Sequence, residues 1–240
     1  IIRISKADLF IYTGPQMEPW VDDILKGITS KTLLVINSSQ GIEMAKEAGN
    51  EHEEADEHQD HGGVDPHIWL DPVLAQQIVS HLADAFAQKD PANRDFYLAN
   101  AKAYIEKRTA LDTKIRITLD KCKRKTIVYG GHFAFGYFAR RYGLDNISPY
   151  AGFSPNAEPT PRKIAEMIET LKKAGTGTIY FEELLEPRVA KIIAEGAGAK
   201  LLLLHGAHNV SKEELDKGIT YLDIMEGNLE RLKIGLGFQE

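Results

Sequence analysis

The sequence predicts an α/β fold of two lobes, each with a parallel sheet flanked by helices, joined by one long linking helix. Five short apolar runs rich in Ile, Leu, Val and aromatic residues alternate with segments of helical pattern. Continuous apolar strands separated by helices are typical of parallel sheets covered on both faces. A stretch of thirty residues without Gly or Pro, from residue 92 onward, predicts the linking helix.

The individual elements follow from these patterns in chain order. Strands are expected at residues 9–12, 32–36, 126–129, 178–181 and 201–204. Helices are expected at residues 18–26, 72–88, 132–142, 161–174, 187–195 and 221–232. Alternation of this kind defines an α/β architecture.

The segment 90–121 is expected to be the linking helix. Asp90 can cap it and Pro91 suits its first turn. At 1.5 Å per residue it would be roughly 45 Å long, which is more than one small lobe needs. We therefore predict an N-terminal lobe at 1–90, the linking helix at 91–121 and a C-terminal lobe at 122–240. The alternative is a long core helix within a single domain.

Charge and cysteine content exclude several classes of function. The net charge is −6, and Lys and Arg are scattered among acidic residues, so the chain lacks the basic stripe of a protein that binds nucleic acid or anionic membrane. The single cysteine, Cys122, can build neither a disulfide framework nor a four-thiolate zinc site. Any metal must therefore be held by His, Asp or Glu.

The start of the chain shows no signal peptide, and no stretch approaches the roughly 20 apolar residues of a membrane span. The chain opens on Ile1 in the middle of a pattern. We expect a processed or truncated segment whose leader is not visible.

The stretch 51–72 points to transition-metal binding. Its acidic part, 51–61, carries three histidines among six carboxylates, which are ligands that suit divalent first-row cations. We expect this part to be a loop that collects metal with modest affinity, although a solvated loop without that role would look the same. His67 differs, because Pro66 and Pro72 stiffen the chain around it.

Three further histidines lie where strands are expected to end. His132 follows the strand at 126–129 and a Gly-Gly pair, and His205 directly follows the run 201–204. His208 lies three residues later, as a second ligand or as a neighbour that fixes a tautomer. Ligands of open α/β sheets collect at the carboxyl ends of strands. The alternatives are helix capping by His132 and turn stabilisation by His208.

Two carboxylates are expected at the same edge. Glu182 and Glu183 follow the strand at 178–181. Either one can complete a metal site, and the alternative is a pair that interacts with the positive end of the next helix.

Catalytic motifs are missing from the sequence. It contains no Gly-x-Ser-x-Gly elbow, phosphate loop, dinucleotide fingerprint or His-Glu-x-x-His helix. We therefore expect a binding protein and no enzyme.

Three segments together resemble the solute-binding proteins of zinc and manganese ABC importers. They are DPHIWLDP at 65–72, GGHFAFGYFARRYGL at 130–144 and PNAEPTPRKIAEMIETLK at 155–172. The likeness extends over essentially the whole chain, and the acidic histidine run resembles the loop of the zinc-specific members. It implies two lobes bridged by a long helix, a metal between them, and delivery to a membrane permease.

The resemblance also implies metal ligands at His67 and His132. The first histidine ligand of the family would precede this chain, and its third ligand position matches Gly152. The fourth position falls at His205, with His208 near it, so the expected set is His67, His132, His205 and His208. A histidine-dominated site favours Zn²⁺ over Mn²⁺, which prefers oxygen ligands.

The sequence thus predicts a monomeric, extracytoplasmic zinc-binding component of an ABC importer, either periplasmic or lipid-anchored. One alternative is a metal-dependent hydrolase or chelatase, which would keep a coordination position open to water. Another is an adhesion or interaction protein with a purely structural zinc, which would unfold without metal.

Overall fold

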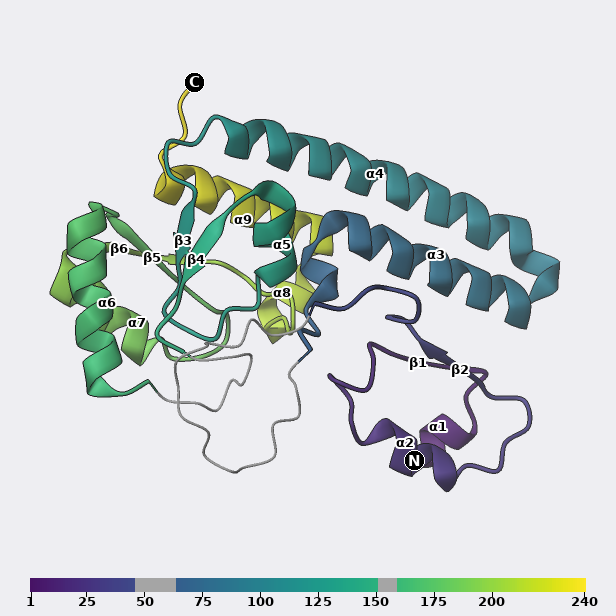
Figure 1. Cartoon of the computed structure of the whole chain (residues 1–240). Coiled ribbons are helices and arrows are strands. Elements are labelled where there is room, and N and C mark those ends of the chain that lie inside the picture. Colours follow the sequence, from purple (N-terminus) through teal and green to yellow (C-terminus); the bar gives the residue numbers. More distant parts are fainter. Residues whose placement is uncertain (46–63, 151–158) are drawn as a thin grey trace. The chain divides into compact units, whose positions relative to one another are not determined.

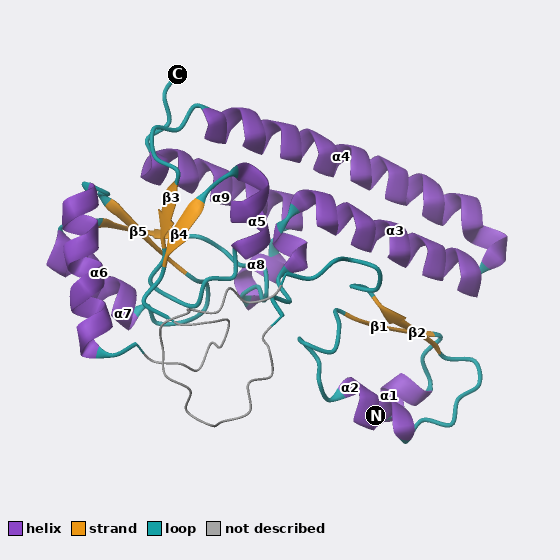
Figure 2. Cartoon of the chain, viewed as in Figure 1, coloured by secondary structure: helices purple, strands orange, loops and turns teal. Residues whose placement is uncertain are grey.

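The computed structural model describes residues 1–45, 64–150 and 159–240, and it divides the chain into two compact units, 1–110 and 111–240. The expected acidic loop at 51–61 and Gly152 lie outside the described residues. Figures 1 and 2 show short strands alternating with helices in both units, which confirms the predicted α/β class. The lobe boundaries expected at 90/91 and 121/122 stay a prediction.

Unit 1 contains one two-stranded parallel sheet. Strands β1 (Leu9–Tyr12) and β2 (Leu34–Asn37) pair with Leu9 opposite Leu34 and Tyr12 opposite Asn37. The helical elements of this unit before the long helix are α1 (Ile2–Ser5), α2 (Val21–Lys26), the 3-10 turns η1 (Ile68–Leu70) and η2 (Pro91–Asn93), and α3 (Pro72–Lys89).

The start of α3 follows from its sequence. Asp71 caps the helix by accepting hydrogen bonds from Val73 N at 2.8 Å and Leu74 N at 3.3 Å, and Pro72 takes the first helical position, where no donor is needed. This cap fixes the end of the preceding segment, which carries His67.

The predicted long helix is present as α4 (Arg94–Asp120), preceded by the turn η2. The boundary between the two units, 110/111, falls inside it. Its buried residues include Leu111, Ile115 and Leu119, which recur at intervals of four and form one stripe. Among the described residues, none of the helices is long and apolar enough to cross a membrane.

Unit 2 contains two parallel strand pairs, β3 (Thr126–Val128) with β4 (Asp145–Ile147) and β5 (Thr178–Phe181) with β6 (Lys200–Leu203). A parallel bridge between Tyr129 and Tyr180 connects β3 to β5. The strands therefore lie in the order β4-β3-β5-β6. The helices of this unit after α4 are α5 (Gly136–Tyr142), α6 (Pro161–Ala174), α7 (Arg188–Ala197), α8 (Lys212–Asp216) and α9 (Tyr221–Leu236).

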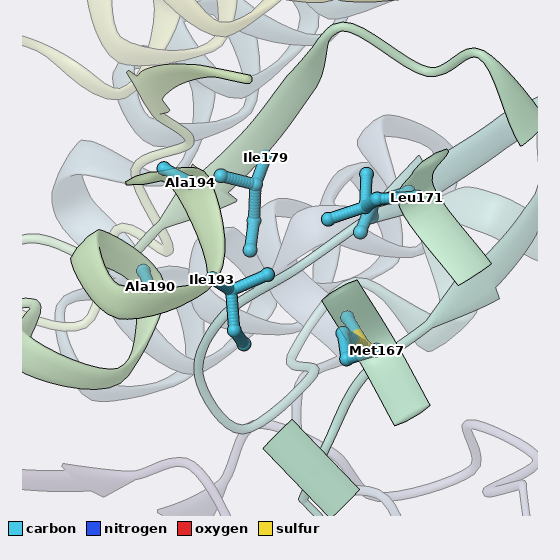
Figure 3. Packing of buried hydrophobic residues seen from close by; sticks show 7 residues of the cluster. Met167, Leu171, Ile179, Ala190, Ile193 and Ala194 are labelled. Carbon is cyan, nitrogen blue, oxygen red and sulfur yellow. The ribbon is translucent and has the colours of Figure 1, made fainter. Parts of the chain in front are cut away.

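A buried apolar cluster holds α6 and α7 to the sheet of unit 2 (Figure 3). Met167 and Leu171 come from one face of α6, and Ala190, Ile193 and Ala194 come from one face of α7. They pack with Ile179 of β5 and Val128 of β3. Truncating a fully buried Ile such as Ile193 costs about 2–5 kcal/mol in comparable cores. This packing fixes the strand ends from which the site is built.

The structure corrects the helix expected at 132–142, which begins at Gly136. Phe133 and Phe135 are buried and pack around Tyr129, with ring centroids 5.8 and 6.0 Å from its ring. This packing holds residues 132–135 in a loop. His132 therefore lies on a loop at the strand end and does not open a helix.

Candidate metal centre

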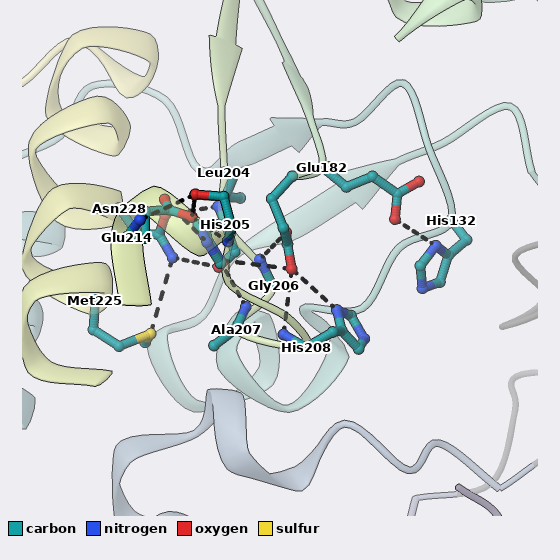
Figure 4. Close-up of polar contacts among 12 residues, drawn as sticks. His132, Glu182, Leu204, His205, Gly206, Ala207, His208, Glu214, Met225 and Asn228 are labelled. Atoms are coloured by element: carbon teal, nitrogen blue, oxygen red, sulfur yellow. Dashed lines mark hydrogen bonds and ion pairs between the residues drawn. The ribbon is translucent and has the colours of Figure 1, made fainter. Parts of the chain in front are cut away.

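The carboxyl ends of β3, β5 and β6 lie at one edge of the unit 2 sheet, because all three strands are parallel. The loop after β3 carries His132, the residues after β5 are Glu182 and Glu183, and the turn after β6 carries His205 and His208. Figure 4 shows His205 and His208 beside the turn at Gly206 and Ala207, and Glu182 extending away from that turn to His132.

His132 is held by the first of the two glutamates. Glu182 Oε2 lies 3.0 Å from His132 Nδ1, and the two side chains are 18% and 7% exposed. The two atoms are in close contact without the alignment of a hydrogen bond, and a carboxylate beside Nδ1 favours the tautomer with a hydrogen on that atom. The imidazole then presents its Nε2 lone pair away from the glutamate.

His208 has the same arrangement with the second glutamate. Glu183 Oε1 lies 3.5 Å from His208 Nδ1 and accepts a hydrogen bond from His208 N at 3.2 Å. Glu183 Oε2 accepts another from Gly206 N at 2.7 Å. One buried carboxylate thus fixes both the backbone of the turn and the direction of the His208 ring.

These contacts keep the Glu183 carboxyl group ionised. Burial by itself raises the pKa of its carboxyl, but the His208 ring and the Gly206 N–H outweigh burial and lower that pKa to about 2. The group is therefore an anion at neutral pH.

His132 and His208 lie close enough to bind one ion. Their ring centroids are 5.8 Å apart, and one nitrogen of each lies within 4.8 Å of the other. Two nitrogens on a tetrahedral zinc with bonds of about 2.0–2.1 Å are roughly 3.4 Å apart. The upper limit of 4.8 Å thus places the two nitrogens near the separation that a shared ion requires.

His205 is built differently from this pair. It is 4% exposed, and its Nδ1 accepts a hydrogen bond from Ala207 N at 3.0 Å. The lone pair of Nδ1 is thereby used, so the hydrogen of the neutral ring sits on Nε2, which is 3.8 Å from Glu214 Oε1. Glu183 Oε1 lies 3.6 Å from the same Nδ1, and Nε2 is buried without a hydrogen-bond partner among the described residues.

Asn228 locks His205 in place from helix α9. Its Oδ1 accepts a hydrogen bond from His205 N, and its Nδ2 donates one to His205 O, both at 2.8 Å. Asn228 is 1% exposed. The sequence analysis did not identify Asn228. Its signal is a polar amide among buried apolar residues of α9 such as Met225 and Leu229.

His67 lies in unit 1 and has its own carboxylate. Asp65 Oδ1 lies 2.7 Å from His67 Nδ1 and also accepts a hydrogen bond from His67 N at 2.9 Å. Both side chains are buried, as are Ile68 and Leu70, which follow them in the sequence. The Asp-Pro-His sequence therefore sets the ring direction locally, with Nε2 as its candidate ligand atom.

The paired histidines and carboxylates define the class of protein. Imidazoles whose Nδ1 atoms face carboxylates are typical of histidine metal ligands, in which the second nitrogen is held by an outer partner. The thiolate and phosphate-loop signatures of other site types do not occur in the sequence. The chain is a metal-binding protein built on a parallel α/β scaffold.

A family model described as zinc-uptake complex component A, periplasmic, matches residues 1–235, and the chain belongs to this family. It is 40% identical over 238 residues to the high-affinity zinc uptake system protein ZnuA of Bacillus subtilis, a match covering 98% of this chain and 74% of that protein. It spans about half the length of the zinc-binding protein AdcA of Streptococcus pyogenes, with 35% identity, 98% of this chain and 47% of AdcA being covered.

Solved structures agree with the family assignment. The metal-dependent lipoprotein YcdH from Bacillus subtilis has a TM-score of 0.81 and 37% identity, with 98% of this chain and 83% of that one covered. The Zn(II)-bound ZnuA-like domain of AdcA from Streptococcus pneumoniae has a TM-score of 0.79 and 32% identity, with 98% and 82% covered. These matches confirm the predicted family of zinc importer solute-binding proteins and the predicted fold.

Proposed function

We propose that this chain binds one Zn²⁺ ion through Nε2 of His67, His132 and His208, and that it delivers the ion to an ABC permease in the membrane. Membership of the zinc-uptake family supports zinc as the ion and a role in import. The ligand set is supported by the structure of each unit taken by itself.

This ligand set is supported by the carboxylate that faces Nδ1 of each histidine, together with the backbone N–H of Ala207, which donates to Nδ1 of His205 but to none of the three. Asp65, Glu182 and Glu183 face the Nδ1 atoms of His67, His132 and His208 at 2.7, 3.0 and 3.5 Å. A hydrogen on Nδ1 leaves the Nε2 lone pair for the metal. His205, whose Nδ1 instead accepts the Ala207 N–H, is assigned a structural role.

Glu182 is assigned to the support of His132 and not to the metal, because its carboxylate already faces the Nδ1 of that ring. Three imidazoles favour Zn²⁺ over Mn²⁺, which prefers oxygen ligands. Zinc is commonly four-coordinate, so a fourth ligand or a water completes the set.

We place the protein outside the cytoplasm, since the matching family is described as periplasmic. We further propose that the chain acts as a monomer and carries out no catalysis. Its task is to capture zinc and hand it on, and this requires no bond in a substrate to be broken.

The test is a competitive chelator titration of the metal-free chain with zinc and with manganese. We expect one tight zinc site and much weaker manganese binding. His132→Ala should weaken zinc binding by at least about 100-fold, more than the 10- to 100-fold that loss of an outer partner costs. His81→Ala is the matched control, because His81 lies on α3 with its Nδ1 3.4 Å from Ser38 O.

A variant lacking residues 51–61 separates the acidic run from the tight site. We expect that variant to keep the tight site and to lose only weaker zinc binding. Tight binding that vanishes with residues 51–61, or that His132→Ala leaves unchanged, would contradict the proposal.

A further inference from the structure

We propose that Glu182 and Glu183 are positioning residues, each holding one histidine of unit 2 in the tautomer that presents Nε2 to the metal. The inference rests on the proposed function for its consequence in zinc binding, but its structural part concerns the metal-free protein alone.

The two glutamates are neighbours in sequence and serve different loops. They directly follow β5, where the Glu182 carboxylate is directed to His132 on the loop after β3 (Figure 4). Glu183 faces His208 on the turn after β6. The order β3-β5-β6 places the end of β5 between the two histidine segments, so one dipeptide supports both rings.

The two glutamates differ in what else they hold. Glu183 is buried and also accepts hydrogen bonds from the backbone of Gly206 and His208, so it fixes the position of the turn as well as the ring. Glu182 Oε2 lies 3.0 Å from Nδ1 of the His132 ring. Removing Glu182 should therefore affect chiefly the ring of His132, whereas removing Glu183 also takes acceptors from the backbone of the turn.

Two glycines give independent evidence that these pairs are closely fitted. A Cβ built on Gly131 would lie 2.9 Å from Glu182 Oε1, and a Cβ on Gly206 would lie 2.6 Å from His208 Nδ1. Both distances are shorter than real Cβ contacts. Each carboxylate–imidazole pair thus packs directly against a bare Cα, where any side chain would displace it.

A carboxylate partner changes how a histidine binds a metal. A carboxylate that accepts the Nδ1 hydrogen fixes the tautomer and ring direction and makes Nε2 a more basic ligand. Loss of a partner of this kind costs about 10- to 100-fold in metal affinity.

The test uses Glu182→Ala and Glu183→Gln. Gln is chosen at residue 183 because it keeps the size of the side chain and replaces one of the two accepting oxygens by an NH2 donor. Glu186→Ala is the control, since Glu186 lies in the same loop, is 67% exposed and faces Lys191. Histidine tautomers are measured by nitrogen NMR of the metal-free chain, and zinc affinity by chelator competition.

We expect the wild-type chain to carry the hydrogen on Nδ1 of His132 and His208 and on Nε2 of His205. Glu182→Ala should change the tautomer of His132 and leave that of His208 unchanged, and Glu183→Gln should change the tautomer of His208 and leave that of His132 unchanged. Each should weaken zinc binding by about 10- to 100-fold, and Glu186→Ala should change neither quantity.

The two proposals fail in different ways. Unchanged tautomers in both variants would overturn the positioning role, as would a fall in affinity that merely follows a lower melting temperature of the metal-free protein. A wild-type chain that binds no zinc would contradict the proposed function, while the tautomers would still decide the positioning role.

Discussion

Replacing Gly206 by Ala should weaken zinc binding without unfolding the protein. The added Cβ would lie 2.6 Å from His208 Nδ1 and 2.8 Å from Cε1, against an ordinary contact of 3.4 Å or more. The ring has to retreat by about 0.8 Å to restore that contact. Zinc–ligand distances tolerate only about 0.2 Å, so the shift is several times too large for an unchanged bond.

The expected loss is comparable to that caused by removing an outer partner of a metal ligand, about 10- to 100-fold in affinity. At 1.4 kcal/mol for each factor of ten, this corresponds to about 1.4 to 2.8 kcal/mol of binding free energy. The backbone N–H of residue 206 is retained in Gly206→Ala, so the hydrogen bond to Glu183 can persist. The melting temperature of the metal-free protein should therefore change little.

The assay is chelator competition on Gly206→Ala and on a matched control, Gly177→Ala. Gly177 precedes β5, and a Cβ built on it meets nothing within 4 Å. The control should bind zinc like the wild type. Equal zinc affinity in both variants would refute the assignment of His208 as a ligand held against Gly206.

Three further outcomes are expected. Asn228→Ala removes the hydrogen-bond partners of His205 N and His205 O, which are buried. Chemical denaturation should show a loss of at least about 1–3 kcal/mol in the free energy of unfolding. The control Asn209→Ala, at an exposed residue, should leave that free energy unchanged. Asp71→Ala removes the cap of α3 and should cost about 1 kcal/mol in the same assay. Zinc affinity should fall as the pH drops below about 6.5, the ordinary pKa of an imidazole, because only a neutral imidazole can bind a metal and protons compete for its lone pair. An affinity that stays constant from about pH 8 to about pH 5 would argue against histidine ligation.

Much of the fold could be predicted because its signals are local. An apolar run marks each of the strands β1, β5 and β6, and a long stretch without Gly or Pro marks α4. Each pattern can be read from a few consecutive residues. Strand β4 (Asp145–Ile147) was not predicted, because it is only three residues long and mostly polar. It forms because residues 126–128 offer a parallel partner, which the sequence of β4 does not reveal.

The histidines of the candidate site could be found from sequence, but their roles could not be divided. His205 and His208 both follow β6, and comparison along the chain favoured His205. We propose His208 instead, because Ala207, with a φ of 53°, donates its N–H to His205 Nδ1. That choice depends on a left-handed backbone at a residue other than Gly, which sequence patterns do not predict.

The supporting carboxylates show the same limit. Glu182 and Glu183 were expected at the correct edge of the sheet, as ligands or as partners of a helix end. Their distances to His132 and His208 depend on how three strand ends lie side by side. The roles of neighbouring glutamates are therefore a property of tertiary packing.

The most direct test compares zinc affinities of His208→Ala and His205→Ala by chelator competition. We expect His208→Ala to lose at least about 100-fold, more than an outer partner contributes. His205→Ala should stay within about tenfold of the wild type in affinity while lowering the melting temperature, since Ala207 N loses its acceptor. The reverse pattern, with His205→Ala losing zinc and His208→Ala retaining it, would contradict the ligand assignment.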